Sequence, residues 1–164
     1  MSTIIIGIGN PVLSDDSVGI KVAHLLGHAL RDRPDVATAE LWAGGLRLME
    51  ALKGHEQAII IDAIVTEGGM PGSVYTLKPS DLRQSRNTCS AHDACFPEAL
   101  ELGAMLGMSL PQQITIWAIE AGDVETFGEK LTREVERAVP TVVEGVMRQI
   151  ELEKPLPTSG GDRT

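Results

Sequence analysis

Two carboxylates and one imidazole stand at positions that the fold could bring into one site. Asp16 follows the first predicted strand and its loop, Asp62 comes directly after three isoleucines in a later strand, and His92 lies in a predicted loop. This set suits a borderline divalent ion that keeps coordination positions open for water or substrate. It also suits general acid–base chemistry, because a carboxylate beside a second carboxylate can share a proton with it. The three residue types therefore predict metal binding, proton transfer or both.

Each of these residues also has a structural alternative. Ser14, Asp15 or Asp16 could lie at the N-terminus of the following helix, where exposed N–H groups favour an oxygen acceptor or an anion. Asp62, at the end of a buried strand, could accept a hydrogen bond from a neighbouring loop. His92 could be an ordinary surface residue. We interpret Asp16, Asp62 and His92 as one site because the predicted topology brings all three to the same edge of a sheet.

Strands and helices are predicted to alternate along the chain. Short apolar runs rich in β-branched residues predict strands, which span residues 3–8, 36–42, 57–64, 73–77 and 113–119. The run at 73–77 is expected to be antiparallel or to lie at an edge. Apolar residues at helical spacing predict helices, which span residues 17–30, 46–52, 93–106 and 131–150. Residues 79–90 are predicted to form a loop.

This alternation predicts an α/β fold, with one three-layer domain in which helices cover both faces of a twisted, mainly parallel sheet. Ligands of such folds bind beyond the carboxyl ends of the strands, which is the edge predicted to hold the three candidate residues. The domain is expected to span residues 1–153. Residues 154–164 are rich in Pro, Gly and Ser and are expected to be a disordered tail.

Composition limits the classes of function. The net charge of −9 argues against a nucleic-acid partner, because binding to phosphates draws on clustered Lys and Arg. No segment reaches the ~18 continuous apolar residues of a membrane span, and the N-terminus has no export signal, so we expect a cytoplasmic protein. Cys89 and Cys95 form neither a CxxC pair nor a zinc pattern and are interpreted as reduced thiols.

Other features indicate less about chemistry. Gly7-x-Gly9 is not a full dinucleotide-binding fingerprint, and no acidic residue ends the second predicted strand, which argues against a dinucleotide site. Gly44-Gly45 is either a tight turn or a place where a peptide can approach the backbone. The remaining histidines are interpreted as surface or loop residues and the tryptophans as packing residues; these are His24, His28, His55, Trp42 and Trp117.

Three motifs in order resemble those of the hydrogenase maturation endopeptidases. Residues 6–10 and 13–19 (IGIGN and LSDDSVG) resemble the first motif, residues 59–63 (IIIDA) the second, and residues 90–93 (SAHD) the third. The family's motifs end in Glu or Asp, in Asp and in His, which correspond here to Asp16, Asp62 and His92. The resemblance spans residues 3–150, nearly the whole predicted domain.

The resemblance implies an endopeptidase that removes the C-terminal extension of a nickel–iron hydrogenase large-subunit precursor after nickel insertion. It implies a fold of the phosphorylase/hydrolase-like kind. We expect the protein to be a monomer. It also implies that Asp16, Asp62 and His92 recognise nickel that arrives with the precursor, although another divalent metal could occupy the isolated protein. Whether the same residues activate the attacking water stays open.

The chain departs from the family pattern at the Gly-Gly turn, and two other functions are possible. The family often has Asp before the Gly-Gly turn and Thr after it, whereas Ala43 and Leu46 stand there in this chain. This difference bears on which hydrogenase class is served, and it leaves open a non-catalytic maturation module of the same fold. Residues 7–11 (GIGNP) also resemble the opening of peptidyl-tRNA hydrolases, but residues 12–18 lack the His and Arg expected there.

Overall fold

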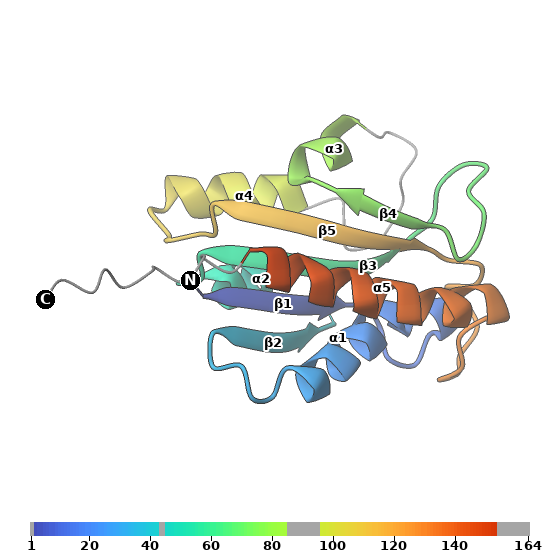
Figure 1. Cartoon of the computed structure of the whole chain (residues 1–164). Coiled ribbons are helices and arrows are strands. Elements are labelled where there is room, and N and C mark those ends of the chain that lie inside the picture. Colours follow the sequence, from blue (N-terminus) through green and yellow to red (C-terminus); the bar gives the residue numbers. More distant parts are fainter. Residues whose placement is uncertain (1, 43–44, 85–95, 154–164) are drawn as a thin grey trace, which may run out of the picture.

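The computed structural model describes residues 2–42, 45–84 and 96–153, and these residues contain a single five-stranded sheet (Figure 1). The strand order across the sheet is β2-β1-β3-β5-β4. The strands are β1 (Thr3–Ile8), β2 (Val36–Leu41), β3 (Gln57–Ile64), β4 (Val74–Leu77) and β5 (Gln113–Glu120). Four strands run parallel, and β4 pairs antiparallel with β5 at one edge. The predicted α/β fold with a mainly parallel sheet is confirmed.

Helices cover both faces of this sheet. They are a 3-10 helix, η1 (Ser14–Ser17), and the α-helices α1 (Val18–Ala29), α2 (Leu46–Leu52), α3 (Pro79–Gln84), α4 (Phe96–Met105) and α5 (Arg133–Leu152). The apolar sides of α1 and α5 pack on one face of β1 and β3, whereas α2 and α4 pack on the other (Figure 1). None of the helices in the described residues has the length and apolar character needed to cross a membrane.

The central strands are buried on both faces, as is usual for parallel strands between two helical layers. All residues of β1 and β3 are buried. In β3, Ile59 and Ile61 pack in the core beneath α1 and α5, and Ile60 packs in the core beneath α2 and α4. Because side chains alternate along a strand, Asp62 belongs to the same face as Ile60.

Two glycines bring η1 and α1 very close to the carboxyl ends of β1 and β3. A Cβ at Gly19, in the first turn of α1, would clash with the carbonyl oxygens of Ile8 and Ile61. A Cβ at Gly9 would clash with the carbonyl oxygen of Asp16, and the φ of 152° at Gly9 also favours glycine. The glycines of the first motif therefore allow Asp16 to lie against the end of β1.

Several predicted elements have the bounds that the sequence indicated. The predicted bounds of β1, β3 and α2 are confirmed, as is the antiparallel edge position of β4. The predicted N-cap of α1 is wrong, because η1 intervenes and Ser17 is the N-cap, without a side-chain hydrogen bond. Ser14 instead donates its hydroxyl to the carbonyl oxygen of Lys130 at 3.1 Å.

The loop predicted at residues 79–90 is wrong in its first half, where α3 forms. Pro79 occupies the first position of this helix, which suits its fixed φ and its missing N–H. The side chain of Asp81 accepts a hydrogen bond from the N–H of Lys78 at 2.8 Å, as in half of a capping box. These local signals were present in the sequence, but the segment is too short to show a helical apolar period.

The tryptophans and histidines were predicted to be packing residues and surface or loop residues, and the structure agrees for most of them. Trp117 is partly buried against the core beneath α5, so its packing role is confirmed. Trp42 is 67% exposed, so its interpretation as a packing residue is wrong; β2 ends at Leu41, one residue before it. His24 and His28 are exposed as predicted, whereas His55 lies in a loop but is half-buried.

Some predictions lie outside the described residues. These are the tail at 154–164, the beginning of the helix predicted at 93–106, and both cysteines, Cys89 and Cys95. The domain bounds of 1–153 stay a prediction.

The glycine contacts give a test of the fold. Gly19→Ala should lower the free energy of unfolding by about 2 kcal/mol or more, because the added methyl group meets backbone carbonyls that cannot move aside. The control is Gly27→Ala in the same helix, where the nearest atom is the flexible side chain of Thr38 at 3.0 Å. Chemical denaturation of both variants measures the difference. Equal stability of the two would contradict the close approach at Gly19.

Candidate functional site

Asp16 and Asp62 lie at the carboxyl edge of the sheet. Asp16 is in η1, which follows β1 and contacts β3. Gly7 of β1 pairs with Ile61 of β3, so Asp62 is level with Ile8, the last residue of β1. The two carboxylates thus reach the same edge from segments that are far apart in the sequence, as the topology predicted. Their catalytic and metal-binding roles stay predictions.

Asp16 is half-buried and helps to shape the turn that follows β1. Its Oδ2 accepts a hydrogen bond from the N–H of Asn10 at 2.9 Å. Its own N–H donates to the carbonyl oxygen of Leu13, also at 2.9 Å. The carboxylate is therefore held beside the end of β1 while part of it remains accessible to solvent, as a group that meets a substrate must be.

Asp62 is more deeply placed, with only 3% of its surface exposed. Its Oδ1 accepts a hydrogen bond from the N–H of Ala63 at 2.8 Å. A carboxylate removed from water is costly unless a hydrogen-bond donor or a cation compensates for the lost hydration. At this buried position the N–H of Ala63 supplies part of that compensation.

His92, the third predicted site residue, lies outside the described residues, as do Ala43 and Gly44 in the Gly-Gly turn. The described chain resumes at Phe96, which is buried in the core beneath α2 and α4. Asp62 belongs to that same face of the sheet. Within residues 2–42, 45–84 and 96–153, no three His, Cys, Asp or Glu side chains are grouped so as to hold a metal ion. A metal site made by the predicted trio thus stays a prediction.

Asp15 has a structural role that the sequence analysis missed. Its fully buried carboxylate accepts four hydrogen bonds. Its Oδ2 receives the N–H groups of Gly122 and Asp123 and the hydroxyl of Thr132, at 2.8, 2.9 and 2.8 Å, and its Oδ1 receives the N–H of Thr132 at 2.7 Å. Thr132 is the N-cap of α5. An acid at a helix N-terminus was one of the alternatives considered, but the helix is α5 and not α1.

Glu120 is a second buried carboxylate that the sequence analysis missed. It is the last residue of β5, and 1% of its surface is exposed. Its Oε1 accepts the N–H of Thr66 at 2.8 Å, and its Oε2 accepts the Thr66 hydroxyl at 2.9 Å. These bonds hold the start of the loop between β3 and β4. The available signal was an acid at the end of an otherwise apolar strand.

Asp123 shapes the loop that follows β5. Hydrogen bonds from the side chain and the backbone of Thr126, and from the N–H of Glu125, lower the pKa of the Asp123 carboxyl. Because the folded-state pKa is lowered, the stabilisation is present above the ordinary carboxyl pKa and is lost as the pH falls through the lowered value. At neutral pH the charged Asp123 carboxylate thus accepts hydrogen bonds within the turn at residues 123–126.

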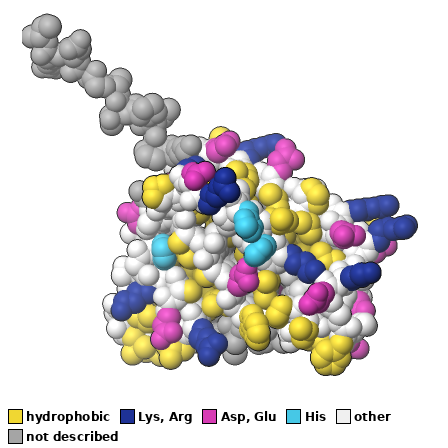
Figure 2. Space-filling model, turned by 90° about the horizontal axis from the view of Figure 1, so that it is seen from below, with side chains coloured by type: hydrophobic (Ala, Val, Ile, Leu, Met, Phe, Trp, Pro, Cys, Tyr) yellow, Lys and Arg dark blue, Asp and Glu magenta, His cyan; other side chains and the backbone are white. Residues whose placement is uncertain are grey.

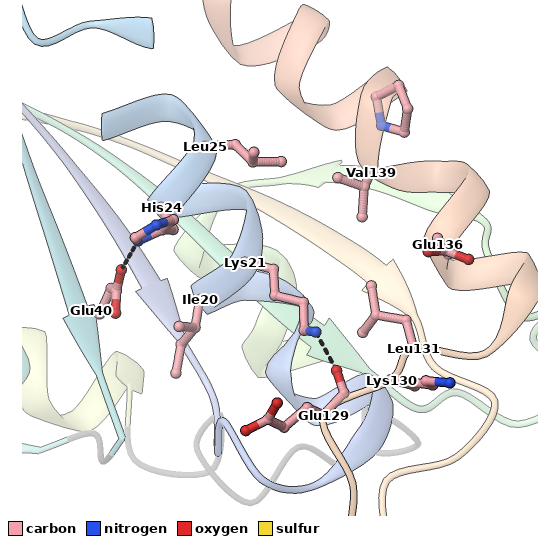
Figure 3. Close-up of a pocket in the computed structure, with 11 residues that line it drawn as sticks. Ile20, Lys21, His24, Leu25, Glu40, Glu129, Lys130, Leu131, Glu136 and Val139 are labelled. Carbon is pink, nitrogen blue, oxygen red and sulfur yellow. Dashed lines mark hydrogen bonds and ion pairs between the residues drawn. The ribbon is translucent and has the colours of Figure 1, made fainter. Parts of the chain in front are cut away.

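A cavity of about 760 Å³ lies apart from these carboxylates, between α1, the first part of α5 and the segment that leads into α5 (Figure 3). Lys21 spans its floor and donates a hydrogen bond to the carbonyl oxygen of Glu129. On its far side, Nδ1 of His24 lies 3.2 Å from Oε1 of Glu40. The cavity is lined by neither Asp16 nor Asp62, so it is not the site that the sequence predicted.

The face on which β2 and α1 lie carries no patch of a single charge. Hydrophobic, acidic and basic side chains are interspersed on it, with histidines among them (Figure 2). A surface that binds a phosphate backbone gathers Lys and Arg on one side. This face therefore gives no support to a nucleic-acid partner.

Comparison with known proteins places the chain among hydrogenase maturation proteins. The sequence model of the hydrogenase maturation protease family matches residues 20–149. The hydrogenase expression/formation protein HupD of Rhizobium leguminosarum bv. viciae is 24% identical over 147 residues, which cover 88% of this chain and 72% of that protein. The hydrogenase 2 maturation protease of Escherichia coli K12 is 25% identical over 152 residues, which cover 90% of this chain and 89% of that protein.

Solved structures show the same similarity of fold. The hydrogenase maturating endopeptidase HybD from Escherichia coli has a TM-score of 0.77 at 22% identity, over 93% of both chains. The [NiFe] hydrogenase maturation protease HybD from Thermococcus kodakarensis has a TM-score of 0.70 at 25% identity, over 91% of this chain and 99% of that one.

The neighbouring acids Asp15 and Asp16 should respond differently to the same substitution. Asp15→Asn should lower the free energy of unfolding by about 2–3 kcal/mol, because an amide group replaces a buried acceptor that faces N–H and hydroxyl donors. Asp16→Asn should change it by less than about 1 kcal/mol, because Asp16 is half-buried and the remaining amide oxygen can still accept the N–H of Asn10. Urea unfolding of the two variants tests this difference. A larger loss at position 16 would contradict the structural role of Asp15.

Proposed function

The chain belongs to the hydrogenase maturation protease family, and on that premise we propose that it cuts the C-terminal extension from the large-subunit precursor of a nickel–iron hydrogenase after nickel insertion. The observation that carries the proposal is the family match over residues 20–149, which includes Asp62 and His92. Membership of a protease family sets aside the non-catalytic module and the peptidyl-tRNA hydrolase that were considered as alternatives.

Asp16, Asp62 and His92 are proposed to meet the nickel that the precursor carries. The metal is then part of the substrate and not a resident cofactor of the enzyme. The placement of Asp16 and Asp62 at one sheet edge supports this arrangement, because carboxylate oxygens and an imidazole nitrogen are ligands that borderline divalent ions accept. The buried setting of Asp62 strengthens its attraction for a cation, because little water competes there.

The proposed reaction is hydrolysis of one peptide bond. Water adds its oxygen to the scissile carbonyl carbon, the C–N bond breaks, and the nitrogen of the released extension takes up a proton. Nickel bound in the precursor can polarise the carbonyl or lower the pKa of the attacking water. Asp16, Asp62 and His92 would orient the metal-bearing segment so that the scissile bond is held at the edge of the sheet.

This arrangement would couple cleavage to metal loading. A precursor that lacks nickel cannot complete the site, because the enzyme supplies only three side chains of the coordination sphere. No separate sensor of nickel is then required. The enzyme itself should hold metal weakly, since tight structural zinc sites usually have four protein ligands. We further propose that it works as a cytoplasmic monomer without a nucleic-acid partner, the last point being supported by the net charge of −9.

The role of Asp62 can be tested against that of Glu120, since both are buried carboxylates at the same edge. Asp62→Asn should reduce cleavage of nickel-loaded precursor by at least ~100-fold while the melting temperature changes little. Glu120→Gln should lower the melting temperature, because an NH2 group replaces one of the two buried oxygens that accept hydrogen bonds from Thr66, yet it should retain cleavage at room temperature. Gel-based cleavage assays and thermal melts of both variants distinguish a functional role of Asp62 from a structural one. An Asp62→Asn enzyme that melts early and still cuts would show that Asp62 is only structural.

A further inference from the structure

Large apolar side chains are exposed around the carboxyl edge of the sheet. They follow the ends of β1, β2, β3 and β5, and we refer to them as the apolar rim: Val12, Trp42, Leu46, Val65, Met70 and Phe127. Phe127 is 81% exposed and Met70 75% exposed. Single exposed apolar residues are ordinary, but a gathering around one site marks an interaction surface.

The aromatic members make this gathering more specific. Aromatic residues are only 3% of the chain, yet a tryptophan and a phenylalanine are both largely exposed at this edge. Aromatic side chains supply much of the binding energy at the centres of protein interfaces. Trp42 and Phe127 stand in the loops after β2 and β5, the strands that lie on either side of the central pair β1 and β3. The rim therefore flanks the edge that holds Asp16 and Asp62.

One part of the rim is held in place by backbone hydrogen bonds. The N–H of Gly128 donates to the carbonyl oxygen of Val12 at 2.8 Å, and the N–H of Ser14 donates to the carbonyl oxygen of Gly128 at 2.9 Å. Leu13 also forms a β-bridge with Phe127. With the bonds of Asp15 to the same loop, these contacts present Phe127 on ordered backbone. Because this loop is already ordered, binding of a partner to Phe127 costs little of the loop's conformational entropy.

The rim residues that follow β3 are held in a similar way. Met70 and Val65 belong to the loop between β3 and β4, which is bound to Glu120 through Thr66. The N–H of Gly72 donates to the carbonyl oxygen of Glu120 at 2.8 Å, so both ends of this loop are hydrogen-bonded to the same residue. Phe127 and Met70 thus stand on two ordered loops, each bound to a buried carboxylate.

We propose that the apolar rim is the surface that docks the folded hydrogenase precursor around its processing site. The partner contributes an apolar protein surface, because the rim side chains are apolar, exposed and distributed over separate loops. The rim residues follow the strand ends at the same edge of the sheet as Asp16 and Asp62, so a protein that presents its scissile segment there should cover these side chains. This inference rests on the proposed function and adds to it a recognition step that does not involve the metal.

The experiment compares Phe127→Ser with Met105→Ser. Met105 is 84% exposed, close to the 81% of Phe127, but it lies at the end of α4 and outside the rim. Phe127→Ser should raise the KM for nickel-loaded precursor by ~10-fold or more and leave kcat within about twofold, because docking is weakened while the chemistry is intact. Met105→Ser should behave as the unchanged enzyme. Thermal melts verify that both variants are folded.

A second variant, Met70→Ser, changes the rim in the loop between β3 and β4 and should also raise the KM for the precursor. A rise in both variants would show that the effect is not limited to the surroundings of Phe127. The dissociation constant of the precursor can also be measured without turnover, by using Asp62→Asn enzyme with and without the Phe127→Ser substitution. The additional Phe127→Ser substitution should weaken binding. Wild-type KM and binding in both rim variants, with normal cleavage, would overturn the docking surface and leave the proposed function standing. Absence of cleavage by the unchanged enzyme would instead overturn the proposed function.

Discussion

The four hydrogen bonds accepted by the Asp15 carboxylate are the interaction on which the carboxyl edge of the sheet depends. They join η1, near the N-terminus of the chain, to Gly122, Asp123 and Thr132, which lie 107–117 residues later. A buried carboxylate without donors would be costly, and here the N-cap residue of α5 and the loop after β5 supply two donors each. The same bonds hold the loop after β5 beside the turn after β1, so Asp16 and Phe127 both owe their positions to Asp15.

Asp16 and Asp62 reach one edge from opposite faces of the sheet. Asp16 comes from the 3-10 turn that leads into α1, and Gly9 and Gly19 allow that turn to lie against the strand ends. Asp62 is in β3, and because side chains alternate along the strand, it belongs to the face beneath α2 and α4 together with Ile60. A substrate that contacts both must therefore approach the end of the sheet, where the rim side chains also project. Chemistry and docking are thus assigned to the same surface of the molecule.

The central elements could be predicted from the sequence because their signals are local. The apolar runs of β1 and β3 must be buried on both faces, and the helical spacing in α2 needs no distant partner. The roles of Asp15 and Asp16 could not be separated, since both stand in one turn and the partners of Asp15 lie more than a hundred residues away. The exposure of Trp42 was missed because hydrophobicity alone predicts burial. His92 rests on the sequence motif and the family match, since the described residues do not include it.

The central claim is that cleavage requires nickel in the precursor and not metal in the enzyme. The most direct measurement incubates chelator-treated enzyme with one precursor prepared in two forms, with and without nickel, and follows release of the C-terminal extension over time. The account predicts efficient cutting of the nickel-loaded precursor by metal-free enzyme and no cutting of the nickel-free form. Equal cutting of both forms would contradict it and would point to a peptidase that selects its substrate by peptide sequence alone.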